Sequence, residues 1–266
     1  MYEEISMFIG EISHSKRDTY KQCGWKFLLK YYERIPESGN NADAMQFGSY
    51  IHKIFELGVS AKTYDELVKI AEEQRPNYTF NDSYNKKVFI CLKNFLRFNA
   101  TLEETVGTEV DFKVPLLEGT EQRVVIDRII KSKKGNYLII DYKTSADEKS
   151  KLDLFNNDQL KAYTYAASKH FNVPVNRITA AHYYPLTNNF VPVAYLPGQI
   201  HKYVSDVQKD VWDIRKKKKE DFCPRKNEFC NWCGYKDKCT EFHSPEDVRA
   251  RIDEAKKSVK ENKLKQ

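Results

Sequence analysis

The chain has 266 residues, 41% of them hydrophobic, and carries a formal net charge of +6 from 44 basic and 38 acidic side chains. This composition is that of a folded protein with a core, and it excludes a disordered chain. No apolar run approaches the ~20 residues that cross a bilayer. The first four residues also lack the pattern of a secretory signal. We therefore expect a cytoplasmic protein, or one in the host-cell cytoplasm if the source is viral, with no membrane partner.

Several enzyme classes are disfavoured by missing motifs. The sequence contains no G-x-x-x-x-G-K-[ST] phosphate loop, no G-x-G-x-x-G, no G-x-S-x-G and no H-E-x-x-H. A nucleotide-driven motor, a dinucleotide enzyme, a serine hydrolase with a nucleophile elbow and a zincin are thus not expected. The modest positive charge is compatible with a nucleic-acid partner but does not establish one.

The spacing of apolar residues predicts a helical first part followed by strands. Helical spacing predicts four helices, over residues 16–32, 44–59, 64–73 and 82–101. Alternating or β-branched segments then predict three strands, over residues 110–114, 123–130 and 137–142, with a turn at 133–136. Further elements are a helix over 157–170, a hairpin from 178–184 and 190–195, and a helix over 199–217. A last, charged helix follows the N-cap Ser244.

Two of the predicted strands carry acidic residues beside apolar ones. Asp127 lies in one strand, Asp141 ends the next, and Lys143 follows on the same face as Asp141 because side chains alternate along a strand. Paired carboxylates repel one another, and a hard divalent cation such as Mg²⁺ or Mn²⁺ relieves that repulsion. A neighbouring ammonium can polarise an attacking water, which is the chemistry of phosphodiester cleavage. Surface ion pairs are the alternative, but solvated faces seldom follow such an apolar strand.

Four short motifs strengthen the catalytic interpretation. They are F-G-S-Y-I-H at residues 47–52, V-I-D-R at 125–128, D-Y-K-T at 141–144 and Q-L-K-A-Y at 159–163. Together they resemble the PD-(D/E)XK nuclease superfamily, specifically its RecB-type branch, which includes AddB nuclease domains and CRISPR-associated RecB-like iron–sulfur exonucleases. The resemblance covers roughly residues 13 to 240. It implies an α/β (α+β) fold of the restriction-endonuclease type, with a mixed central sheet flanked by helices, a helical N-terminal region and a Cys-rich C-terminal segment.

The resemblance also implies roles for individual residues. The metal ligands would be His52, Asp127, Asp141 and the backbone carbonyl of Tyr142. Lys143 would orient or activate the water, and Gln159 and Tyr163, on one helical face, would support that lysine or hold the DNA backbone. Glu56 and Glu109 are candidates for residues that support the metal ligands from behind. Taken alone, His52 would more often be a structural or surface histidine, and Glu109 could equally be a solvated strand end.

Six cysteines in a reducing compartment require an explanation other than disulfides. Three of them form a compact cluster in a segment rich in turn residues, which predicts a metal site: Cys230, Cys233 and Cys239. The candidates for a fourth ligand are Cys23, Cys91 and Cys223. Cys91 lies on an apolar helical stripe and is best interpreted as a core residue. The resemblance implies that Cys23 joins the trio around a [4Fe–4S] cluster; the spacing alone also fits zinc, and the resemblance favours iron–sulfur.

For domain organisation, we expect a single nuclease domain over residues 1–243 and a charged helix or tail over 244–266. Within the domain, residues 1–102 would form a helical part, 103–220 the nuclease core, and 221–243 the cluster segment that closes onto Cys23.

The leading hypothesis for function is a metal-dependent DNA exonuclease with a structural [4Fe–4S] cluster. The resemblance implies action on single-stranded DNA or DNA ends, with 5′→3′ as one of the two polarities that the motifs allow, in recombination, repair or CRISPR-type DNA processing. Homo-oligomers or a recombination or repair protein are the expected protein partners. One alternative is a non-degradative DNA-binding or processing subunit that works with a helicase, integrase or recombinase. A third, weaker hypothesis is an RNA-directed nuclease.

Overall fold

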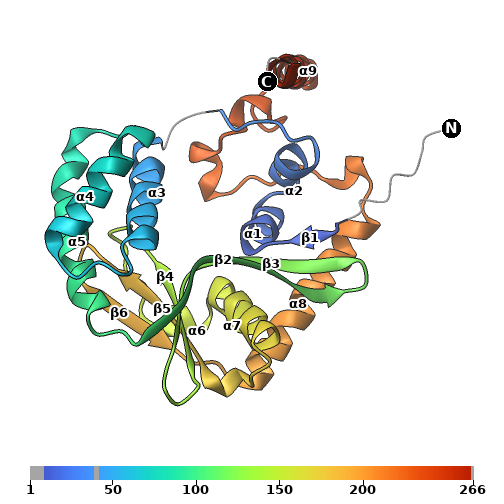
Figure 1. The fold of residues 1–266 in the computed structure, drawn as a ribbon. Coiled ribbons are helices and arrows are strands. Elements are labelled where there is room, and N and C mark those ends of the chain that lie inside the picture. Colours follow the sequence, from blue (N-terminus) through green and yellow to red (C-terminus); the bar gives the residue numbers. More distant parts are fainter. Residues whose placement is uncertain (1–8, 39–41, 265–266) are drawn as a thin grey trace. The chain divides into compact units, whose positions relative to one another are not determined.

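The computed structural model describes residues 9–38 and 42–264 (Figure 1). The chain divides into two compact units. The terminal unit comprises residues 1–40 and 207–266, and the central unit comprises residues 41–206. Across the described residues, no helix combines the length and apolar character needed to cross a membrane.

The central unit begins with three helices and continues into a sheet with further helices. Its helices are α3 (Ala42–Leu57), α4 (Tyr64–Gln74), α5 (Asn85–Asn99), α6 (Lys151–Phe155) and α7 (Asp158–His170). Its strands are β2 (Glu104–Leu117), β3 (Thr120–Lys131), β4 (Tyr137–Tyr142), β5 (Ile178–Tyr184) and β6 (Asn189–Val193). The division between the units falls within α8 (Pro197–Lys216).

The sheet of the central unit is mixed. Its strand order is β3-β4-β5-β6, with β2 paired to β3. Only β4 and β5 run parallel among these pairs, and the chain between them includes α7, as a parallel crossover requires. A mixed central sheet flanked by helices confirms the predicted fold class.

The two faces of the sheet are covered by different helices, as Figure 1 shows. Ile140 and Tyr142 of β4 point into a core with α3, α4 and α5, where Phe55 stacks on Phe95 at 4.0 Å. Asp141 points to the opposite face, because side chains alternate along a strand. On that face α7 packs, and Tyr163 from α7 reaches Asp141. The alternation therefore turns one residue of an apolar strand towards a polar site while its neighbours hold the core.

The terminal unit brings N-terminal and C-terminal segments together. Its helices are α1 (His14–Gln22), α2 (Gly24–Phe27), a π-helix (Leu28–Tyr32) and α9 (Pro245–Leu264), and a short strand β1 (Glu11–Ile12) precedes α1. Tyr235 donates a hydrogen bond to the carbonyl of Ile35 at 2.6 Å, and Trp25 donates one to the carbonyl of Lys238 at 2.7 Å. Phe27 stacks on Phe222 at 5.7 Å.

Most predicted elements are confirmed, with two notable differences. The helix predicted over 16–32 is interrupted, because Cys23 takes an extended conformation between α1 and α2. The close approach of Gly24 to the backbone of Cys223 accompanies this break, since a Cβ at Gly24 would lie 3.3 Å from that carbonyl oxygen. The short α6 was not predicted. The thin apolar stripe of α9 packs inside the terminal unit, where Ile252 contacts the cluster of Leu29, Ile35 and Tyr235.

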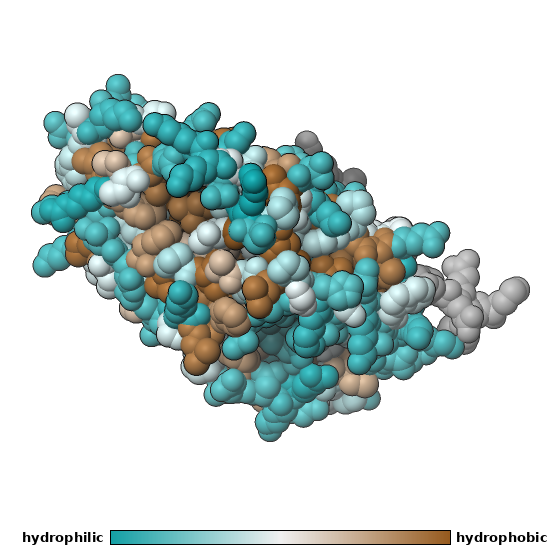
Figure 2. All heavy atoms as spheres, turned by 90° about the horizontal axis from the view of Figure 1, so that it is seen from below, coloured by the Kyte–Doolittle hydropathy of each residue, from teal (hydrophilic) through white to brown (hydrophobic). Residues whose placement is uncertain are grey.

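Large apolar side chains also reach the surface at several points. Brown apolar groups lie among teal hydrophilic ones in the space-filling view (Figure 2). Within the described part of the chain, the most exposed large hydrophobic residues are Leu152, Trp232, Met45 and Leu196. Scattered exposure of this kind is normal for a folded protein and does not by itself mark a binding surface.

Candidate metal-dependent active site

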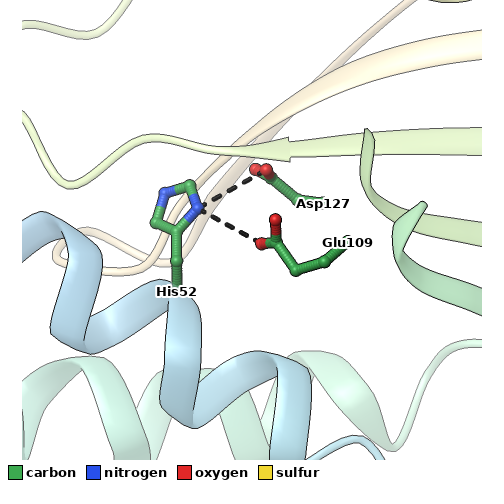
Figure 3. A group of neighbouring side chains, drawn as sticks. All are labelled: His52, Glu109 and Asp127. Carbon is green, nitrogen blue, oxygen red and sulfur yellow. Dashed lines mark ion pairs between the residues drawn. The ribbon is translucent and has the colours of Figure 1, made fainter. Parts of the chain in front are cut away.

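Three side chains from three elements of the central unit converge on one point (Figure 3). His52 comes from α3, Asp127 from β3 and Glu109 from β2. The Nδ1 atom of His52 lies 3.4 Å from Asp127 Oδ1 and 3.8 Å from Glu109 Oε1. One potential ligand atom from each residue lies within 4.8 Å of the others. The second ring nitrogen, Nε2, is 3.1 Å from the carbonyl oxygen of Tyr142, so the imidazole spans two polar groups.

Glu109 reaches this point through an unusual backbone conformation. Its φ is +47°, in the left-handed region that side chains other than glycine seldom adopt. Backbone strain of this kind is of order 1–3 kcal/mol and tends to occur at functional sites. The pairing of β2 with β3 is also irregular two residues earlier, between Thr105 and Gly107. The sequence indicated Glu109 only as a candidate support for the metal ligands, and the structure places its carboxylate beside His52.

The charges of this group are mutually dependent. Burial disfavours the imidazolium, but Asp127 and Glu109 outweigh that effect and raise the pKa of His52 to about 10. Burial, with the neighbouring Asp141, raises the pKa of Asp127, although His52 and a backbone N–H act in the opposite direction. In the metal-free protein, the neighbouring carboxylates thus favour the protonated form of His52.

Asp127 and Asp141 occupy opposite positions on neighbouring strands. The antiparallel register pairs Arg128 with Ile140, and continuing it by one residue sets Asp127 against Asp141. There the backbone N–H of Tyr142 donates to Asp127 Oδ2 at 2.6 Å. The carboxylate of Asp127 therefore serves as the acceptor at the end of the ladder, which fixes its orientation.

Lys143, Gln159, Tyr163 and Asp141 form a closed circuit of polar contacts. Lys143 Nζ donates to Gln159 Oε1 at 3.1 Å, and Gln159 Nε2 donates to the Tyr163 hydroxyl at 2.8 Å. The hydroxyl donates to Asp141 Oδ1 at 3.4 Å, and Lys143 Nζ lies 2.5 Å from Asp141 Oδ2 in an ion pair. Burial, with Asp141 nearby, raises the pKa of Tyr163 well above its usual value, so the hydroxyl stays protonated and can donate.

Sequence reasoning missed His182. This residue lies on β5 in parallel register with Asp141, is only 2% exposed, and places its Nε2 3.3 Å from Asp141 Oδ2. A histidine inside an otherwise apolar strand was the available signal. Glu56, which the sequence indicated as a candidate support for the metal ligands, forms an ion pair with Lys53 at 2.8 Å.

The residues present fit a hard divalent cation. His52, Glu109 and Asp127 supply one imidazole and two carboxylates at close range, and Asp141 and the Tyr142 carbonyl lie beside them. Oxygen-rich sets of this kind suit Mg²⁺ or Mn²⁺.

In the terminal unit, four cysteines line one cavity: Cys23, Cys230, Cys233 and Cys239. Backbone N–H groups point at two of the sulfurs, from Arg225 to Cys23 at 3.4 Å and from Asn227 to Cys230 at 3.3 Å. The two remaining cysteines, Cys223 and Cys91, lie elsewhere. Cys223 lines a different cavity, and Cys91 is buried in the core of the central unit, where burial raises its pKa to about 12.

Comparison with known proteins identifies the family. The family model of the PD-(D/E)XK nuclease superfamily matches residues 11–240. The chain belongs to the PD-(D/E)XK nuclease superfamily. Members of this superfamily use divalent metals, in agreement with the His-Glu-Asp group described above.

Two similar proteins extend this result. The chain is 24% identical over 220 residues to one subunit of the ATP-dependent helicase/deoxyribonuclease of Streptococcus mutans serotype c, covering 73% of this chain and 20% of that protein. It therefore spans about a fifth of the length of this relative. A solved structure from Eubacterium rectale, described as a candidate exonuclease, superposes with a TM-score of 0.54 at 14% identity, covering 84% of this chain and 87% of that one. The structural likeness supports the fold alone.

Proposed function

We propose that this chain is a divalent-metal-dependent DNA exonuclease that hydrolyses phosphodiester bonds in single-stranded DNA or at DNA ends. The observation that carries the proposal is the convergence of His52, Glu109 and Asp127 beside the Asp141–Lys143 pair. The named relative, part of a helicase/deoxyribonuclease, supports DNA as the substrate and a helicase as a partner. The present sequence has no phosphate-loop motif, so nucleotide-driven movement would come from residues outside it.

Each residue has a role in this proposal. His52, Asp127, Asp141, Glu109 and the Tyr142 carbonyl would hold the cation. When bound, the cation supplies charge stabilisation to the scissile phosphate. Lys143, which is 30% exposed, would turn from Asp141 to orient the attacking water.

Gln159 and Tyr163 would hold the side chains of Lys143 and Asp141 in position. Gln159 accepts from the lysine, and Tyr163 donates to the carboxylate. An intact circuit of this kind favours catalysis over a purely DNA-binding role, because a remnant site would have no need to retain it.

The test is cleavage of end-labelled single-stranded DNA, duplex DNA and RNA with Mg²⁺ or Mn²⁺. We expect stepwise shortening of DNA from an end. Asp127→Ala and Lys143→Ala should abolish cleavage and leave DNA binding largely intact. Wild-type cleavage by both variants would refute the active-site assignment. If only RNA is degraded, the substrate is RNA and the proposal of a DNA nuclease is wrong.

We further propose that Cys23, Cys230, Cys233 and Cys239 bind a structural [4Fe–4S] cluster. Their shared cavity and the two N–H···S contacts support this. Zinc held by the same four thiolates is the alternative, because both groups use four cysteine ligands.

Anaerobically purified protein should accordingly be brown, with broad absorbance near ~400 nm and bound iron and sulfide. A colourless preparation with stoichiometric zinc and no iron would exclude the cluster.

A further inference from the structure

Two buried polar atoms face each other beneath the active site. His182 Nε2 and Asp141 Oδ2 are 3.3 Å apart. Among the described residues, the imidazole nitrogen makes no hydrogen bond of good geometry, whereas the carboxylate oxygen also forms the ion pair with Lys143. Buried polar atoms almost always find a partner. Whether these two attract or repel depends on which imidazole nitrogen carries the proton.

The surroundings of His182 select one tautomer. The backbone N–H of Lys149 donates to the Tyr184 hydroxyl at 2.8 Å, and that hydroxyl lies 3.1 Å from His182 Nδ1. If the phenol gives its own proton to Nδ1, the remaining proton of a neutral ring is on Nε2 and points at Asp141. The opposite tautomer would set two lone pairs against each other and leave the phenol proton without this acceptor.

The doubly protonated ring is also disfavoured by this geometry. With protons on both ring nitrogens, the Tyr184 hydroxyl would face two donors, His182 Nδ1–H and the Lys149 N–H, and its own proton would lack this acceptor.

We propose that His182 is a positioning residue that holds Asp141 through a directional relay, from the Lys149 N–H through Tyr184 and His182 Nε2–H to Asp141 Oδ2. The proposal rests on the proposed function in that Asp141 is taken as a carboxylate of the metal site. The relay has a distinct use there. Lys143 contacts the same oxygen at 2.5 Å, and when it turns to the substrate, His182 keeps that oxygen in place.

The tautomer can be measured directly in the metal-free protein. Nitrogen-15 NMR of the histidine side chains, assigned by comparison with His182→Gln, should show His182 protonated at Nε2 and unprotonated at Nδ1 at pH 7. In Tyr184→Phe, which removes the donor to Nδ1, this preference should weaken. A ring protonated at Nδ1, or at both nitrogens, would overturn the proposal.

Two matched variants then test the contact with Asp141. The amide of His182→Gln can reach the position of Nε2 and donate to Asp141, whereas the shorter His182→Asn reaches only the position of Nδ1. Outer-shell partners of metal ligands typically change metal affinity or activity 10–100-fold. We expect about that loss of Mn²⁺ affinity and turnover in the asparagine variant and only a few-fold loss in the glutamine variant.

The two variants are first shown to be folded by circular dichroism and urea unfolding. Equal losses in both variants, or no loss in either, would refute the relay. Failure of the wild-type protein to bind Mn²⁺ or cut DNA would instead refute the proposed function, and the NMR result would still decide the tautomer.

Discussion

The ion pair between Asp141 and Lys143 should be strongly coupled even without metal. Asp141 is 2% exposed, and Lys143 Nζ lies 2.5 Å from its Oδ2. Removing one partner of a buried pair costs about 3–5 kcal/mol, because an uncompensated charge remains. Since the Lys143 side chain is 30% exposed, water replaces part of the lost interaction, and we expect Lys143→Met to cost about 2 kcal/mol.

A double-mutant cycle isolates this interaction. Lys143→Met leaves the buried carboxylate of Asp141 without its partner. Adding Asp141→Asn removes that charge, so the double variant should be no less stable than Lys143→Met alone. The coupling energy should then be at least the loss caused by Asp141→Asn alone, which we expect to be about 1 kcal/mol because a hydrogen-bonded charge is removed. It is measured by urea unfolding in EDTA. A loss of 2 kcal/mol corresponds to a fall of about 4–8 °C in the melting temperature of a unit of this size. All three variants should lack nuclease activity.

A surface pair provides the control. Lys202 and Asp206 are 2.9 Å apart on α8, with side chains 75% and 48% exposed. Exposed pairs at this helical spacing couple by only about 0.3–0.5 kcal/mol. If the stability losses of the two single variants of Asp141 and Lys143 add up to that of the double variant within about 0.5 kcal/mol, as in this control, the buried pair does not contribute as argued.

Two further predictions concern the terminal unit. Burial alone would raise the pKa of Glu33, but Lys219 and Lys256 hold it below its usual 4.5. Glu33→Gln should therefore lower the free energy of unfolding by about 1 kcal/mol at pH 7. This difference from the wild-type protein should disappear as the pH falls below 4.5 and through the lowered pKa of Glu33. A difference in stability that persists at pH 2 would contradict this prediction. Asn227→Ala removes the hydrogen bonds that the Asn227 side chain donates to the carbonyls of Gln22 and Arg225. The variant should lose iron to a chelator several-fold faster than the wild-type protein, as followed by absorbance. An unchanged rate would show that this side chain does not stabilise the cluster.

The parts of the site that sequence reasoning predicted depend on local patterns. The strand over 137–142 was predicted with the bounds that the structure has, because its apolar residues are continuous and a turn precedes it. The same turn sets the register that brings Asp127 opposite Asp141. Lys143 follows on the same face from the period of two. A short hairpin is thus enough to position the central charges.

The residue that was missed depends on distant pairing, and the residue whose position was left open depends on backbone strain. His182 lies beside Asp141 only because β5 pairs in parallel with β4, after a crossover that includes α7. No local pattern gives the register of such a pair. Glu109 was a candidate whose alternative was a solvated strand end, and it reaches His52 through a positive φ, which sequence periodicity does not reveal. His182 became apparent only when the tertiary structure placed it beside Asp141.

The site has solvent-exposed residues and buried residues, and the two groups differ in their roles. His52, Glu109 and Lys143 are each about 30% exposed, whereas the side chains of Asp141 and His182 are 3% exposed or less. The exposed groups are accessible to water, a cation and the substrate. The buried groups are not, so contacts within the protein must set their orientation. Asp141 therefore depends on fixed donors, and a change in those donors should alter its alignment before it alters the fold.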